Sequence, residues 1–275
     1  MVPRGLYIAG MDILNRIRKR PPLVAVIRLH GMIASGPRGP LSDEALAPVI
    51  EKAFRKGKPA AVALMINSPG GSPVQSSLIA ARIRRLSEEK GVPVVAFVED
   101  TAASGGYWLA CAAEEIFADR ASVVGSIGVI SAGFGAHVLL ARQGVERRVH
   151  TSGKSKSMLD PFQPEKEEDV IRLKGLLEDI HVAFVDHVVE RRAGKLKDDD
   201  RIFTGEFWLA NKAEELGLID GIAHLVPEMK ARFGDKVRFR RYGPRRGWMS
   251  RIGANIVADT LAGIEERAAY ARFGL

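Results

Sequence analysis

The chain has 275 residues, of which 46% are apolar and 27% are charged. These proportions are close to those of ordinary globular domains and exclude a disordered or collagen-like chain. A chain of this length can bury a core without covalent cross-links. Cys111 is the one cysteine, so an intrachain disulfide is excluded as well.

The net charge of +8 is concentrated in two flanking segments. Residues 1–20 carry five Lys or Arg against one Asp, and residues 230–251 carry nine Lys or Arg against one Asp, so the rest of the chain is mildly acidic. We interpret the flanks as solvated faces. The alternative is peripheral contact with a membrane surface, because Trp248 and Met249 stand within the second basic run. No nucleic-acid partner is expected.

The sequence predicts neither a secretory signal nor a membrane span. Residues 1–20 lack the apolar core of ~7–15 residues that cleaved signals contain. Residues 121–141 carry no charge and imitate a span, but the glycines among them suit turns better than an unbroken apolar helix. We expect a buried strand, a loop and the start of a helix there. The expected location is the cytoplasm or the periphery of a membrane.

Apolar runs that alternate with helical patterns predict a parallel or mixed sheet with helices on its faces. Near-continuous apolar runs with β-branched residues are typical of strands that are buried on both faces. The predicted strands are 23–29, 60–66, 92–98 and 116–118, with further short strands within 122–130 and over 145–150. The predicted helices are 42–55, 73–89 and 164–192. A further helix is expected to begin near Ser104, and an amphipathic one is expected over 252–275.

The first candidate site segment is INSPGG, residues 66–71, between a predicted buried strand and a predicted helix. Gly70 and Gly71 have no side chain, so their backbone N–H groups can approach a ligand closely and adopt positive φ. Donors that lie at a strand end and face a helix N-terminus form an anion site. Taken alone, the segment is better explained as an ordinary strand-to-helix turn.

The second candidate segment is TAASGGYW, residues 101–108, which also follows a predicted strand. Ser104 stands where the chain must turn into a helix, so its hydroxyl is exposed above the sheet edge. The N–H of Gly105 can support an oxyanion, and Gly106 leaves further room for an incoming carbonyl. The segment is not a G-x-S-x-G elbow, since Ala102 occupies the first glycine position. A helix cap is the alternative role of Ser104.

A nucleophilic serine requires a base, and the residues leave several candidates. Among the six histidines, His137 opens a predicted helix and stays a candidate. His181 and His187 lie on the long amphipathic helix, where a packed or solvated role is expected. The remaining candidates are Lys154 and Lys156, which lie in the small-residue segment TSGKSKSM.

INSPGG, TAASGGYW with GSIGVI, and SGKSK stand in an order that resembles the signal peptide peptidase A (protease IV) family of serine peptidases. The resemblance continues through GEFWLANKAEELGLIDGI and covers about residues 22–226. It implies an α/β fold of the Clp protease/crotonase-like type, built of stacked ββα units. The chain resembles one catalytic unit of the kind that some members carry in tandem, without the N-terminal anchor common in the family. The expected regions are a basic segment (1–21), a peptidase domain (22–226) and a basic and amphipathic extension (227–275).

The resemblance also implies a Ser-Lys dyad and no metal or other cofactor. Ser104 matches the family's nucleophile, and the fifth position of SGKSK, which is Lys156, matches its lysine. Gly70 and Gly105 match the oxyanion-hole positions, with Gly71 as a substitute for Gly70.

The chemistry of such a dyad is coherent. A lysine acts as a base only when it is neutral, and burial away from water favours the neutral form. No acid lies between Lys156 and Asp160, which permits that burial. Ser104 would attack a peptide carbonyl, Lys156 would take its proton, and water would later release the acyl-enzyme. The expected substrates are signal-peptide-like, membrane-derived or unfolded peptides.

Two other functions fit the same scaffold. A crotonase-like acyl-CoA enzyme would hold a thioester enolate with two backbone N–H groups and use Glu99 or Glu114 as its acid or base. A non-catalytic membrane-surface scaffold would work through the basic flanks.

Because one motif set per chain resembles half of a tandem member, a peptidase of this kind is expected to be a homo-oligomer whose sites are completed between subunits.

Overall fold

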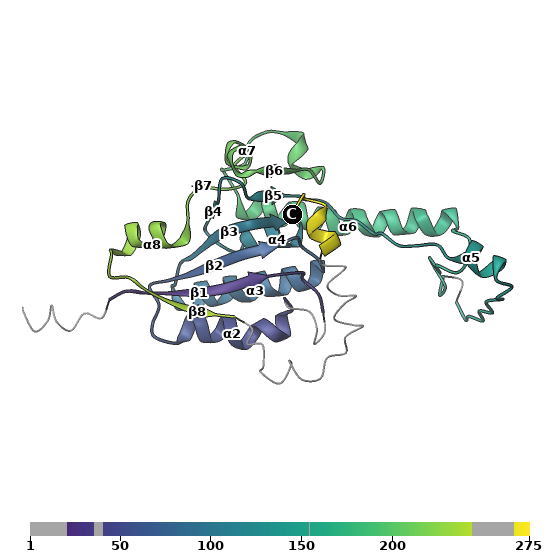
Figure 1. The fold of residues 1–275 in the computed structure, drawn as a ribbon, viewed down its shortest axis with the longest axis horizontal. Coiled ribbons are helices and arrows are strands. Elements are labelled where there is room, and N and C mark those ends of the chain that lie inside the picture. The colour runs from purple at the N-terminus through teal and green to yellow at the C-terminus, as the bar shows by residue number, and fades with distance from the viewer. Residues whose placement is uncertain (1–20, 36–40, 154, 244–266) are drawn as a thin grey trace, which may run out of the picture.

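The computed structural model describes residues 21–35, 41–153, 155–243 and 267–275, which fold around one eight-stranded sheet (Figure 1). The strands are β1 (Leu23–His30), β2 (Ala61–Ser68), β3 (Val94–Ala103), β4 (Glu115–Ala118), β5 (Val123–Gly125), β6 (Phe207–Leu209), β7 (Gly221–Ile222) and β8 (Arg238–Tyr242). The helices are α2 (Asp43–Arg55), α3 (Pro73–Lys90), α4 (Gly105–Ala110), α5 (His137–Arg142), α6 (Glu167–Arg191), α7 (Ala210–Glu215) and α8 (Leu225–Phe233), with a 3-10 turn η1 (Asp200–Phe203). The predicted strands before residue 120 and the helices predicted over 42–55, 73–89 and 164–192 are present, within a few residues of the expected ends. The strand predicted over 145–150 is wrong, because this segment is irregular. Most of the helix predicted over 252–275 lies outside the described residues, as do Trp248 and Met249.

The long strand β3 organises the sheet, whose main order is β6-β5-β3-β2-β1-β8. β4 pairs with the first half of β3 and β5 with its second half, and all strand pairs are parallel except β5 with β6. Since the carboxyl ends of parallel neighbours meet at one sheet edge, the turn after β2 and the turn after β3 lie side by side. The sheet thereby brings the two candidate site segments together.

The main core lies between the sheet and the helices α2, α3 and α4, and a smaller core lies under α8 on the opposite face. Ser42 caps α2 as predicted, because its Oγ accepts a hydrogen bond from the N–H of Ala45 (3.3 Å). The predicted domain boundary at residue 226 falls within α8. Beyond it, β8 pairs with β1 and is part of the same sheet.

Only the second half of α6 packs on this body. Phe184 and Val188 are buried against the main core, whereas residues 130–176, here called the arm, extend away from the sheet with α5 at their outer end (Figure 1). The buried strand, the loop and the helix start predicted over 121–141 are present as β5, the chain that follows it and the first turn of α5. Phe134 on the arm is 95% exposed, and Ile130 and Leu139 are exposed as well. Among the described residues, no helix combines the length and the apolarity that a membrane span needs.

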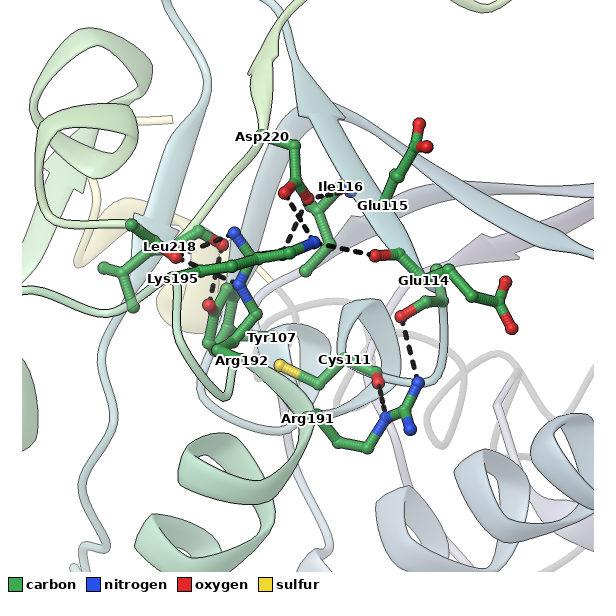
Figure 2. Close-up of polar contacts among 12 residues, drawn as sticks. Tyr107, Cys111, Glu114, Glu115, Ile116, Arg191, Arg192, Lys195, Leu218 and Asp220 are labelled. Carbon is green, nitrogen blue, oxygen red and sulfur yellow. Dashed lines mark hydrogen bonds and ion pairs between the residues drawn. The ribbon is translucent and has the colours of Figure 1, made fainter.

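A buried guanidinium joins the end of α6 to the sheet (Figure 2). Arg192 is 2% exposed and donates to the carbonyl of Gly217 (3.0 and 2.7 Å) and to Asp220 Oδ2 (2.6 Å). Asp220 also accepts from the N–H of Ile116 on β4 (2.7 Å) and pairs with Lys195 (2.7 Å). Burial by itself would raise the pKa of Asp220, but these donors outweigh burial and hold that pKa below its ordinary value. The GLID segment, residues 217–220, therefore supplies the acceptors for Arg192.

The same region holds the short helix α4 in place. The Tyr107 hydroxyl donates to the carbonyl of Leu218 (2.7 Å), and Arg191 donates to the carbonyls of Cys111 (2.9 Å) and Ala113 (3.3 Å) (Figure 2). Carbonyls at the end of a helix have no partner within the helix. Because α6 supplies these donors, the position of α4 depends on the anchored end of α6.

Asp220→Asn is expected to lower the free energy of unfolding by about 3–5 kcal/mol, because it leaves the Arg192 guanidinium buried without its countercharge. Urea denaturation followed by circular dichroism measures the change. Glu215→Gln is the matched control, since it removes a carboxylate from an exposed pair with Lys212 (2.8 Å) and should cost less than about 1 kcal/mol. Equal effects of the two substitutions would contradict the anchoring role.

Candidate active site

Ser104 lies at the junction of β3 and α4 in a backbone conformation that is uncommon for a residue with a side chain. Its φ is 52° and its ψ is −124°, a region that typically costs ~1–3 kcal/mol. The conformation is held by hydrogen bonds from Ser104 N–H to the carbonyl of Gly125 (2.9 Å) and from the N–H groups of Tyr107 (2.9 Å) and Trp108 (3.1 Å) to the Ser104 carbonyl. Ser104 occupies the N-cap position of α4, but its side chain makes no capping bond there.

The turn after β2 packs so closely against Ser104 that it excludes a side chain. A Cβ on Gly70, whose φ is +105°, would lie 2.8 Å from Ser104 Cβ and 2.9 Å from Gly105 N. Within α4, a Cβ on Gly105 would lie 2.5 Å from Ser76 Oγ. These glycines are therefore required by the close approach of two backbones as well as by any ligand.

The backbone N–H groups beside Ser104 differ in what they contact. The N–H of Gly70 donates to Ser68 Oγ (3.2 Å), within its own turn. The N–H groups of Gly71 and Gly105 have no acceptor in the described part of the chain, and both residues line the cleft that contains Ser104. The structure thus places two unpaired donors, and one that is engaged within the turn, around the serine.

The cleft that contains Ser104 has a volume of about 840 Å³ and lies between the glycine turns and α6. Its walls include apolar side chains from several elements, among them Met32, Trp108, Leu177 and Phe184. Trp108 is fixed by stacking on Phe184, with ring centroids 4.9 Å apart. Clefts of this size are typical of ligand sites, and the polar side chains of Lys174 and Glu178 line this one as well.

The histidine that lines the cleft is His181, which the sequence analysis assigned to a packed or solvated role. Its Nε2 is buried and has no partner among the described residues. The spacing of Leu177, His181 and Phe184 along one face of α6 is the signal that could have identified it. The packed role is correct for His187, which stacks on the Trp108 ring (4.7 Å) and has a pKa lowered by burial.

The other candidate bases do not lie at Ser104 in the single chain. His137 lies on α5, and Lys156 is exposed on the arm, where its N–H donates to the carbonyl of Gly153 (3.2 Å). Neither of them lines the cleft. Lys154 lies outside the described residues. One copy of the chain therefore does not bring the two members of the predicted dyad together.

The carboxylates considered for an acyl-CoA enzyme also lie away from the cleft. Glu114 accepts a hydrogen bond from the N–H of Val94 (2.6 Å) and pairs with Arg84 (2.5 Å), which is a structural role. Glu99 pairs with His30 (Nε2 to Oε2, 2.5 Å), and burial raises the pKa of Glu99 and lowers that of His30 to about 4. The described residues contain no cluster of His, Cys, Asp or Glu that could hold a metal ion.

The chain is similar in sequence to parts of longer proteins. The chain is 47% identical over 280 aligned positions to a Brucella melitensis protein named Na(+)/H(+) antiporter NhaA, covering 95% of this chain and 38% of that protein. It is 32% identical over 210 positions to the chloroplastic serine protease SPPA of Arabidopsis thaliana, covering 74% of this chain and 31% of that protein. The chain thus spans well under half the length of both relatives.

The fold is similar to that of a solved membrane-bound stomatin-specific protease in complex with a substrate peptide. The TM-score is 0.53 at 12% identity, and the match covers 88% of this chain and 99% of that chain. The architecture is thus of the predicted Clp protease/crotonase-like type. Residues 87–231, more than half of the chain, match peptidase family S49. Together with the Ser104 turn and its cleft, this match shows that the chain belongs to peptidase family S49.

Proposed function

We propose that the chain is a serine endopeptidase whose nucleophile is Ser104. The observation that carries the proposal is the strained turn at Ser104, which opens into a cleft with both apolar and polar walls, beside backbone N–H donors. A sharp turn of this kind presents a serine Oγ to a substrate carbonyl in other hydrolases. Membership of family S49 and the name of the Arabidopsis relative, a serine protease, support the same assignment.

The reaction follows from the groups around the serine. Ser104 Oγ attacks the peptide carbonyl carbon while a base takes its proton, and the N–H of Gly105 stabilises the oxyanion. The base then protonates the departing amine, and water releases the acyl group from Ser104 by the same route. Gly70 is the second oxyanion donor that the resemblance implies. Gly71 is the alternative, since the Gly70 N–H must first leave Ser68 Oγ.

The base proposed is Lys156 of a neighbouring copy. The arm that carries Lys156 exposes apolar side chains to an extent unusual for a monomer surface, including Ile130 (65%), Phe134 (95%) and Leu139 (60%). Burying each of them stabilises an assembly by about 1.5–3 kcal/mol. An assembly that covers the arms would enclose Lys156 beside the cleft of the next subunit. His181 is the second candidate base, because it already lines the cleft.

The substrates proposed are apolar or unfolded peptide segments, including signal-peptide-like ones. Met32, Leu177 and Phe184 give the cleft apolar walls, which bind an extended apolar segment by removing its side chains from water. The peptide bound to the stomatin-specific protease supports a peptide substrate for this fold.

Ser104→Ala is expected to lower peptide hydrolysis by roughly 10³-fold or more and to abolish labelling by a fluorophosphonate probe. The melting temperature should change little, because the hydroxyl makes no capping bond. Ser77→Ala, at an exposed serine of α3, is the control and should keep both activities. Cleavage by Ser104→Ala at the parent rate would place the nucleophile elsewhere.

Gly70→Ala is expected to lower kcat/KM by about 100-fold, because the new Cβ would displace Ser104 and Gly105 from the reacting geometry. Gly91→Ala is the matched control, since Gly91 also has positive φ (+59°) but has open space around it. Both substitutions carry backbone strain, so loss of activity in Gly70→Ala alone would separate crowding at the site from a general loss of stability. Equal activities of the two variants would contradict the crowding.

Mixing Ser104→Ala with Lys156→Ala tests the shared site. Each variant alone should be inactive, and subunit exchange should restore part of the activity, because some sites then combine an intact serine with an intact lysine. Lys154→Ala should stay active. If mixed oligomers form without any recovery, each dyad belongs to one chain. If Lys156→Ala is active and His181→Ala is not, the base is His181.

A further inference from the structure

Ser68, the last residue of β2, lies directly behind the candidate active site. It pairs with Ala102 on β3, two residues before Ser104. Ser68 is 0% exposed, and a Cβ on Gly106 would lie 3.1 Å from Ser68 Cβ. Because Ser68 is buried and does not line the cleft, its hydroxyl does not face a bound peptide. Any influence of this hydroxyl on the reaction must therefore act through the neighbouring backbone.

The Ser68 hydroxyl joins two backbone segments that follow different strands. Its Oγ donates a hydrogen bond to the carbonyl of Gly31 (2.8 Å), just after β1, and accepts one from the N–H of Gly70 (3.2 Å), just after β2. The hydroxyl proton is used by Gly31, so the oxygen presents a lone pair to Gly70. The hydroxyl thereby fixes the direction of the Gly70 N–H.

A second hydrogen bond fixes the other side of Gly70. The N–H of Ile33 donates to the Gly70 carbonyl (2.9 Å). In the trans peptide group that joins Gly70 to Gly71, the carbonyl and the N–H point in opposite directions. The Gly71 N–H therefore points away from Ile33, and its nitrogen lies 3.4 Å from the position that a Cβ on Gly105 would occupy. The N–H groups of Gly71 and Gly105, which have no acceptor in the described part of the chain, thus belong to neighbouring residues of the cleft wall.

We infer that Ser68 is a positioning residue that directs the Gly71 N–H at the oxyanion. Gly70 has a φ of +105° and, as a glycine, would have several orientations open to it without restraint. With its N–H held by Ser68 and its carbonyl held by Ile33, Gly70 cannot rotate without breaking one of these bonds, so the peptide group that carries the Gly71 N–H keeps its direction. The inference rests on the proposed peptidase function, and it selects Gly71 as the donor beside Gly105.

Ser68→Ala removes both contacts of the hydroxyl, and hydrolysis of a fluorogenic peptide measures the result. Because the oxyanion forms only in the transition state, kcat should fall roughly 10- to 100-fold while KM stays unchanged. The rate at which a fluorophosphonate probe labels Ser104 should fall by a similar factor, since the phosphoryl oxygen of the probe takes the place of the oxyanion. Ser68→Thr keeps the hydroxyl and should restore most of both rates.

Ser87→Ala is the matched control for the loss of a buried serine hydroxyl. Ser87 is 5% exposed, and its Oγ donates to the carbonyl of Val92 (2.8 Å), away from the cleft. This substitution should lower the melting temperature about as much as Ser68→Ala and leave both rates unchanged. Each kcat is expressed per mole of chain that the probe finally labels, so that a loss of folded protein cannot imitate a slower reaction.

The inference is overturned if Ser68→Ala keeps the parent's kcat, or if KM rises while kcat is unchanged. A higher kcat would overturn it as well, because it would mean that the Gly70 N–H, released from Ser68, is the donor. A folded Ser68→Thr chain as slow as Ser68→Ala would also contradict it.

Ser68→Cys serves as the second variant if Ser68→Ala does not fold. A thiol is only a weak hydrogen-bond donor and acceptor, so this variant should show the same selective loss of kcat. The proposed function and the positioning role fail in different ways. If the parent neither hydrolyses peptides nor is labelled at Ser104, the proposed function fails and the inference falls with it. If the parent is active and the Ser68 variants match it, the positioning role alone is wrong.

Discussion

The close approach of two backbone turns is the constraint on which the rest of the site depends. The turn after β2 passes within van der Waals contact of Ser104, and Gly70 is the residue that permits this contact. Behind it, Gly71 packs on the carbonyl of Ile33, whose N–H in turn bonds to the carbonyl of Gly70 (2.9 Å). Ser104 keeps its strained conformation because these neighbours leave it no relaxed alternative. The nucleophile position is thus a property of the sheet edge.

The long helix α6 serves the site in two different ways. Its anchored end is tied down by Arg192 and Asp220, and from there it supplies Arg191 to the carbonyls after α4. Its outer half extends with the arm, on which Ile130, Phe134 and Leu139 are exposed in a single copy. A rigid anchor at one end of a helix makes the position of the other end reproducible. An assembly of copies could therefore place the Lys156 loop of one chain against the cleft of the next.

The cleft combines features that are specified at very different distances along the chain. Trp108, four residues after Ser104, stacks on the rings of Phe184 and His187, so this wall of the cleft joins α4 to α6.

The sequence by itself determined the features that rest on local physics. Uninterrupted apolar runs predicted β1, β2 and β3, Ser42 marked the start of α2, and the small residues around Ser104 marked a turn above the sheet edge. Each of these signals acts within a few residues, through burial, capping or backbone freedom. The order of the motifs added the family and the identity of the nucleophile as an expectation.

Only the tertiary structure decided which distant groups meet. The run 121–141 reads as equally apolar throughout, yet its first part is buried under neighbouring strands and the rest lies exposed on the arm. The sequence alone indicates that His181 is an ordinary residue of an amphipathic helix. The position of α6 beside the cleft shows that it lines the site. Which of Gly70 and Gly71 has an unpaired N–H depends on Ser68 and Ile33. Burial and hydrogen-bond partners depend on segments that are far away in the chain. A local sequence pattern therefore does not predict which side chains are buried or what they bond to.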